Sequence, residues 1–166
     1  RSEDLKIVLN CLQKQVLSAL LDYEVIIVDN NSNDDTRSVV ASLLPAFQGK
    51  LKYLFEPRQG KPFAINRGIK ESKGEIIVLT DDDCTVERNY LEEIYTTFKN
   101  HGSAIGFIGG KISPRWVNCS KPDWFDRLEP DWFKDFFWGP LAILDYGDKP
   151  FIINGQLYES LGKKLF

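Results

Sequence analysis

Residues 73–83 read KGEIIVLTDDD, a short apolar run that ends directly in three carboxylates. The run at 75–79 is typical of a buried strand. Adjacent negative charges repel one another and lose solvation on burial, so a cation is the natural partner of Asp81, Asp82 and Asp83. Mg²⁺ or Mn²⁺ commonly uses one or two protein carboxylates and fills its other positions with waters and substrate phosphates. The stretch predicts a strand that ends at a divalent metal site, and a solvated acidic turn is the alternative.

Strands and helices alternate on both sides of this stretch. The apolar spacing and the turn residues predict strands at 24–28, 51–55, 75–79 and 104–108, and helices at 2–20, 36–44, 63–72 and 87–100. Pro45 is expected to stop the second of these helices. Such alternation favours an α/β fold with a mostly parallel sheet.

Acidic residues follow two of the predicted strands. Asp29 comes directly after the first strand, as Asp81, Asp82 and Asp83 come after the third. In an open parallel sheet, ligands bind outside the carboxyl ends of the strands. If the connections are right-handed and the strands are near neighbours, the two acidic ends line a single crevice.

Composition restricts the class of protein only broadly. The chain has 166 residues, of which 43% are hydrophobic, so it can bury one sizeable core and we expect a single domain. The net charge of −3 offers no general attraction to nucleic acid. The three cysteines lack the spacing of a zinc site, and their odd number does not indicate a disulfide framework. We expect a cytoplasmic protein, with the cytoplasmic face of the membrane as a second location.

Three segments carry a resemblance to a known family. YEVIIVDNNS at 23–32, GKPFAINRGI at 60–69 and KGEIIVLTDDD at 73–83 are similar, in the same order, to motifs of the family 2 glycosyltransferases. The resemblance covers residues 5–111 well. It implies a GT-A type fold, in which a Rossmann-like, mostly parallel sheet is flanked by helices. The implied domain is 1–166, with a nucleotide-sugar-binding part at 1–111 and an acceptor-side part at 112–166, and we expect it to be incomplete at both ends.

The resemblance also implies roles for matching residues. Asp29 would contact the base or ribose of a nucleotide-sugar donor, and Lys61 would lie near the uracil or the diphosphate. Asp83, the last acid of the run, would be the direct metal ligand, and Asp82 is its competitor. The implied donor-binding set is Asp29, Asn31, Lys61, Asp81 and Asp82, and the implied ligands of Mn²⁺ or Mg²⁺ are Asp83 and Asp81.

The expected activity is an inverting, metal-dependent hexosyl transfer from a nucleotide-diphosphate sugar, with uridine diphosphate as the carrier, to a glycan or lipid-linked acceptor in polysaccharide biosynthesis. Inversion needs a base for the acceptor hydroxyl. The sequence identifies none, and Asp145 and Asp148 are the candidates. One alternative is a non-catalytic nucleotide-sugar-binding or glycan-binding domain. Another is a dinucleotide-dependent oxidoreductase, which the absence of G-x-G-x-x-G disfavours. The partners expected are donor and acceptor, without nucleic acid, and peripheral membrane association fits a lipid-linked acceptor.

Overall fold

The computed structural model describes residues 1–110, 112–121 and 123. The chain divides into two compact units, Arg1–Gly102 and Ser103–Phe166. The candidate site residues from Asp29 to Asp83 all belong to the first unit. The predicted single domain over 1–166 stays a prediction.

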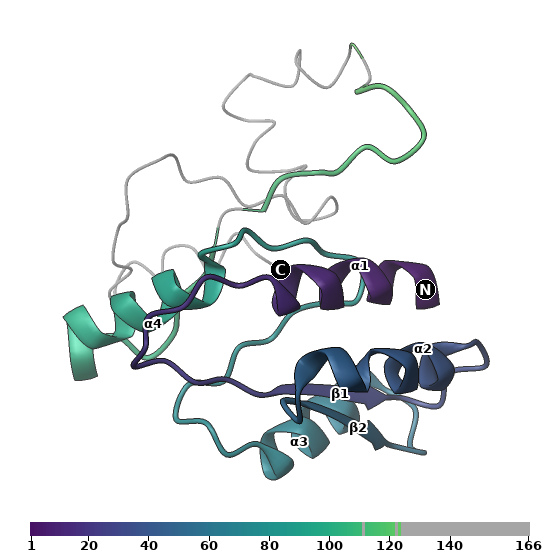
Figure 1. Cartoon of the computed structure of the whole chain (residues 1–166), viewed down its shortest axis with the longest axis horizontal. Coiled ribbons are helices and arrows are strands. Elements are labelled where there is room, and N and C mark those ends of the chain that lie inside the picture. The colour runs from purple at the N-terminus through teal and green to yellow at the C-terminus, as the bar shows by residue number, and fades with distance from the viewer. Residues whose placement is uncertain (111, 122, 124–166) are drawn as a thin grey trace, which may run out of the picture. The chain divides into compact units, whose positions relative to one another are not determined.

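The first unit alternates helices with two strands (Figure 1). Its elements are α1 (Ser2–Gln13), β1 (Val25–Asp29), α2 (Thr36–Leu43), a 3₁₀ turn (Leu44–Phe47), β2 (Leu51–Phe55), α3 (Lys61–Glu71) and α4 (Tyr90–His101). A further 3₁₀ turn, Gly102–Ala104, follows α4. Helix α2 ends just before Pro45, as expected, because proline cannot donate the next helical hydrogen bond. No helix among the described residues is both long and apolar enough to cross a membrane.

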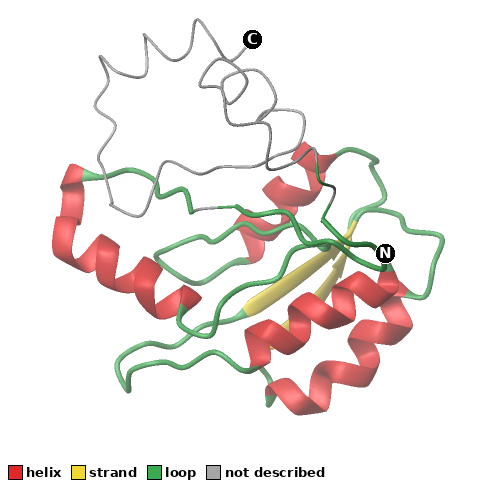
Figure 2. Ribbon diagram, turned by 90° about the horizontal axis from the view of Figure 1, so that it is seen from above, coloured by secondary structure: helices red, strands yellow, loops and turns green. Residues whose placement is uncertain are grey.

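The two strands form a parallel pair, with Val25 opposite Leu51 and Asp29 opposite Phe55. They lie side by side in both views (Figures 1 and 2), and α2 and α3 lie on opposite faces of the pair (Figure 1). Helix α3 approaches β1 closely, because a Cβ added at Gly68 would lie 3.3 Å from a Val28 methyl group. The predicted α/β layering and parallel pairing are confirmed for these elements.

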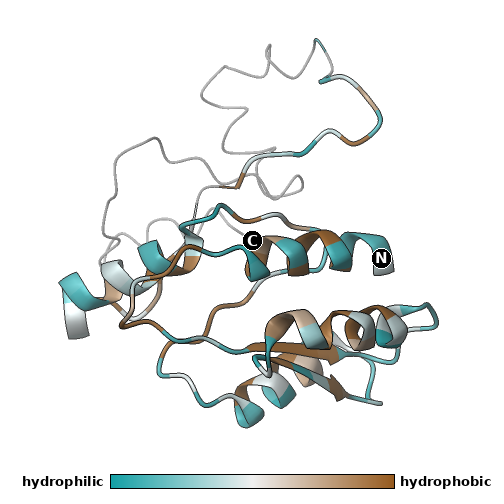
Figure 3. Ribbon diagram, in the orientation of Figure 1, coloured by the Kyte–Doolittle hydropathy of each residue, from teal (hydrophilic) through white to brown (hydrophobic). Residues whose placement is uncertain are grey.

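The core lies between the sheet and the first two helices. Leu9 of α1 and Val40 of α2 are fully buried. They share a cluster with Val25 of β1 and Leu51 of β2, and both strands are hydrophobic along most of their length (Figure 3). This packing fixes the position of β1, and therefore that of Asp29, its last residue.

The first helix is shorter than its apolar spacing predicts. It ends at Gln13, and the side chains of Val16 and Leu20 are 61% and 78% exposed. The residues after it bond to the segment before α4 instead: the Gln15 amide donates to the Glu87 carbonyl at 2.7 Å, and the Val16 N–H donates to the Arg88 carbonyl at 2.7 Å. Because these residues bond to partners distant in the sequence, they do not continue the helix.

The strands predicted at 75–79 and 104–108 are wrong. Residues 75–79 and 105–108 are irregular, Ala104 ends a 3₁₀ turn, and Leu79 and Phe107 are 61% and 69% exposed. An apolar run becomes a strand only where a neighbouring strand satisfies its backbone groups. In the described part of the chain, the only hydrogen-bonded strand pair is β1 with β2.

Candidate functional site

Asp29 is the last residue of β1 and is buried, with 6% of its surface exposed. Its two carboxylate oxygens accept hydrogen bonds from the Tyr53 hydroxyl at 2.6 Å and from the Ser32 backbone N–H at 2.8 Å. Burial raises the pKa of Asp29, but the bonds from Tyr53 and Ser32 outweigh it and hold the pKa below its ordinary value. Burial and the Asp29 contact raise the pKa of Tyr53 to about 12. Asp29 is therefore an ionised acceptor beside a neutral phenol.

A pocket of about 350 Å³ opens beside Asp29. It is lined by Asp29, Ser32, Asp34, Arg37, Tyr53 and Phe55. Asp29, Tyr53 and Phe55 lie on the same face of the sheet, because side chains alternate along each strand and the register pairs Asp29 with Phe55. The pocket thus combines aromatic walls with a buried acceptor, which suits a flat heterocycle that carries an N–H group.

Asn31 has a conformational role in this loop. It is exposed and has a φ of 63°, in the left-handed region that asparagine tolerates better than most residues. The turn it makes allows the N–H of Ser32 to reach back to Asp29. Its predicted contact with a donor stays a prediction.

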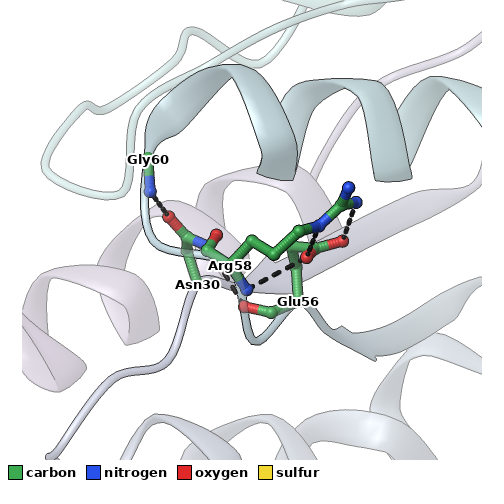
Figure 4. Close-up of polar contacts among 4 residues, drawn as sticks. All are labelled: Asn30, Glu56, Arg58 and Gly60. Atoms are coloured by element: carbon green, nitrogen blue, oxygen red, sulfur yellow. Dashed lines mark hydrogen bonds and ion pairs between the residues drawn. The ribbon is translucent and has the colours of Figure 1, made fainter.

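Asn30 ties the end of β1 to the loop 56–60 (Figure 4). Its side-chain nitrogen donates to the carbonyls of Glu56 at 3.1 Å and Arg58 at 2.6 Å, and its side-chain oxygen accepts from the Gly60 N–H at 2.7 Å. Gly60 has a φ of 131°, which strongly favours glycine, and it is the N-cap of α3. One amide therefore fixes the turn from which α3 starts.

Glu56 braces the same loop from within. It is 3% exposed, and its carboxylate accepts from the Arg58 side chain at 2.7 and 3.0 Å and from the Arg58 N–H at 3.1 Å (Figure 4). The bonds from Arg58 lower the pKa of Glu56 from 4.5 to about 2. The Arg58 guanidinium also lies 4.8 Å from the centre of the Phe63 ring.

The Glu56 pKa predicts a pH dependence of folding. A carboxyl group whose pKa is lowered on folding stabilises the protein fully above its unfolded pKa, and loses that effect as the pH falls toward the folded value. We expect the free energy of unfolding, measured with urea, to fall between pH 4.5 and about 2 more steeply in the wild type than in Glu56→Gln. Glu87→Gln, at an exposed position, is the control. Parallel pH curves for wild type and Glu56→Gln would contradict the assignment.

Lys61 joins this loop to the acidic run. It is the first residue of α3, and its ammonium group lies 2.7 Å from a carboxylate oxygen of Asp81. Asp81 raises the pKa of Lys61. The two acidic ends predicted to share a crevice are thus connected through Asn30, Gly60 and Lys61, and not through adjacent strand ends.

The carboxylates of the acidic run, Asp81 to Asp83, are suited to a hard cation that takes its other oxygens from a bound ligand. Asp81 and Asp83 are exposed, and carboxylate oxygens are the donors that Mg²⁺ and Mn²⁺ prefer. In the described residues, no group of three His, Cys, Asp or Glu side chains could hold a metal ion. A metal here would need oxygens from a ligand such as a diphosphate. Burial, followed by the neighbouring Asp83, raises the pKa of the Cys84 thiol, which disfavours the reactive thiolate form.

The site residues predicted from the sequence and those that the structure brings together are not the same set. Asp145 and Asp148, the candidate bases, lie outside the described residues. The sequence reasoning missed Asn30, Tyr53 and Glu56. Tyr53 could have been found by aligning the two strands, since it lies two residues before the end of β2 on the Asp29 face. Asn30 and Glu56 look like ordinary turn residues.

Comparison with known proteins identifies the family. The chain matches the model of glycosyl transferase family 2 over residues 1–161. It belongs to this family. The GT-A fold implied by the family resemblance is therefore its fold class, and the parallel pair flanked by helices is the part of the sheet that the structure describes.

Several proteins similar to this chain are glycosyltransferases by name. The glycosyltransferase AglE of Haloferax volcanii is 30% identical over 96 residues, which are 58% of this chain and 31% of that protein. The glucosyl-dolichyl phosphate glucuronosyltransferase of the same organism is 25% identical over 114 residues, 69% of this chain and 33% of that protein. A GalNAc(5)-diNAcBac-PP-undecaprenol beta-1,3-glucosyltransferase of Campylobacter jejuni is 38% identical over 64 residues, 37% of this chain and 20% of that protein.

The chain thus spans well under two thirds of the length of the curated relatives it matches. No solved structure matches it significantly.

Proposed function

We propose that this chain belongs to an inverting, metal-dependent glycosyltransferase that transfers a hexosyl group from a uridine diphosphate sugar, with residues 1–111 as the donor-binding part. The observation that carries the proposal is the Lys61–Asp81 contact of 2.7 Å. In a chain of family 2, this contact brings a positively charged ammonium group next to the acidic run. A diphosphate carries several negative charges, and an ammonium group beside metal-binding carboxylates suits it.

Each candidate site residue from Asp29 to Asp83 has a role in this proposal. Asp83 and Asp81 hold the divalent cation, with Asp82 as the competing ligand, and Lys61 contacts the diphosphate. Asp29 accepts a hydrogen bond from the base, within the pocket walled by Tyr53. Asn31 contributes from the loop after β1.

The chemistry requires that negative charge be stabilised on the leaving group. Breaking the sugar–diphosphate bond leaves a nucleoside diphosphate, and in this proposal the Lys61 ammonium group stabilises its developing charge. A bound Mn²⁺ or Mg²⁺ would supply further Lewis-acid stabilisation there. Inversion requires a base that takes the proton of the acceptor hydroxyl. Asp145 and Asp148 stay the candidates for that base.

The acceptor is proposed from the names of relatives. Two of them name a dolichyl phosphate or an undecaprenol-linked glycan, and another is named a succinoglycan biosynthesis protein. We propose a glycan or lipid-linked acceptor of polysaccharide biosynthesis, reached by peripheral association at the cytoplasmic face of the membrane. Transfer of labelled sugar to a lipid extract tests this, and binding of donor without any transfer by the intact protein would favour a non-catalytic donor-binding domain.

We expect a uridine diphosphate sugar to raise the melting temperature only when Mn²⁺ or Mg²⁺ is present. The carboxylates of the acidic run repel a diphosphate, so they approach it only through a cation. Thermal shift measurements with a panel of nucleotide sugars, each with metal and with excess chelator, provide the test. Equal stabilisation in chelator would rule out the metal-dependent mode of binding.

A further inference from the structure

We propose that Asn30 is a positioning residue, whose amide locks the loop 56–60 to the end of β1 and thereby holds Lys61 against Asp81. This inference rests on the proposed function for its ligand, since Lys61 is the group that would meet the diphosphate. The lock itself can be tested without any ligand.

The side chain of Asn30 uses both ends of its amide on one short loop. It donates to two backbone carbonyls, those of Glu56 and Arg58, and accepts from the backbone N–H of Gly60. An aspartate could replace the acceptor but neither donor, and an alanine would replace none of them. The pattern of these contacts therefore requires an amide at this position.

The loop 56–60 connects the end of β1 to Lys61. The Glu56 N–H donates to the Asp29 carbonyl at 2.9 Å, so the loop begins hydrogen-bonded to the strand end. Gly60 ends the loop, and its carbonyl accepts from the Phe63 N–H at 3.0 Å in the first turn of α3. Lys61 is the next residue. A shift of Gly60 would therefore move the backbone of Lys61.

The Lys61–Asp81 pair is too exposed to hold the loop by itself. The two side chains are 70% and 58% exposed, and ion pairs between exposed side chains add little to stability. The backbone from which Lys61 extends must then be held by other contacts. Asn30 supplies three of these contacts. The ion pair between Glu56 and Arg58, which both belong to the loop, supplies further ones.

Hydrogen exchange in the absence of nucleotide tests the lock. In Asn30→Ala, we expect the Gly60 amide to exchange at least about tenfold faster, because it loses its acceptor, while the amides of β1 keep their protection. Asn10→Ala, on an exposed position of α1, is the matched control. If Asn30→Ala fails to fold, Asn30→Leu is used, which keeps nearly the same side-chain size, also removes the acceptor of the Gly60 N–H and should show the same gain in exchange at Gly60. Unchanged exchange at Gly60 and the rest of 56–60 overturns the proposal.

A double-mutant cycle tests the action through Lys61. Binding of uridine diphosphate with Mn²⁺ is measured by calorimetry for wild type, Asn30→Ala, Lys61→Ala and the double variant. We expect Asn30→Ala to weaken binding about tenfold and the double variant to bind no more weakly than Lys61→Ala. Additive losses, or no loss in Asn30→Ala, overturn the positioning role. A wild type that binds no nucleotide contradicts the proposed function instead, and the exchange experiment then decides the lock alone.

Discussion

Replacing Asp83 with alanine should abolish metal-dependent donor binding. Asp83 is exposed at the end of the acidic run, and the proposed metal has few protein ligands because a diphosphate would complete its coordination. Loss of a hydrogen-bond partner behind a metal ligand already costs about 10–100-fold in affinity, so loss of a ligand should cost about 100-fold or more. Calorimetry with uridine diphosphate and Mn²⁺ measures the effect.

Two further variants make this prediction specific. Asp82→Ala tests the competing ligand in the same run, and Asp22→Ala removes an exposed acid that pairs with Lys50 in another part of the unit. We expect Asp22→Ala to bind as the wild type does. A large loss in Asp82→Ala with none in Asp83→Ala would transfer the ligand role to Asp82. Full binding by both variants would contradict a metal site in the acidic run.

The sheet was predictable where the sequence itself supplied both partners. The apolar runs at 24–28 and 51–55 are separated by a helix, so they pair in parallel, and the structure pairs Val25 with Leu51. The run at 75–79 is just as apolar, but pairing depends on a neighbour that no local pattern reveals. The predicted end of α1 was wrong for the same reason, because Gln15 bonds to Glu87, a residue 72 positions away.

The candidate site was predictable to a similar degree. Asp29 and the acidic run stand out because each follows an apolar run, and the motif resemblance added Lys61. Their mutual arrangement was not predictable, because it depends on the Asn30 amide and on the ion pair between the buried Glu56 and the exposed Arg58, two residues apart. A glutamate that begins a turn normally lies in solvent, so nothing in the sequence marks Glu56 as buried.

Replacing Asp29 with asparagine should remove the preference for uridine over cytidine diphosphate. A carboxylate only accepts hydrogen bonds, whereas an amide both donates and accepts, and it has nearly the same shape. N3 of uracil carries a hydrogen and N3 of cytosine does not, so an ionised Asp29 in the pocket should favour uracil. The low pKa of Asp29 keeps it ionised at neutral pH. Competition binding of the two nucleotides, each with Mn²⁺, measures the preference.

The expected loss of preference for uridine is large because hydrogen bonds to a charged group contribute about 1.5–3 kcal/mol, or roughly 10–150-fold in affinity. Tyr53→Phe is the companion variant, since it keeps the carboxylate and removes the hydroxyl that donates to it at 2.6 Å. That variant should retain the preference for uridine. If Asp29→Asn retains it as well, with its fold intact by circular dichroism, the base is bound elsewhere and the pocket beside Asp29 is not its site.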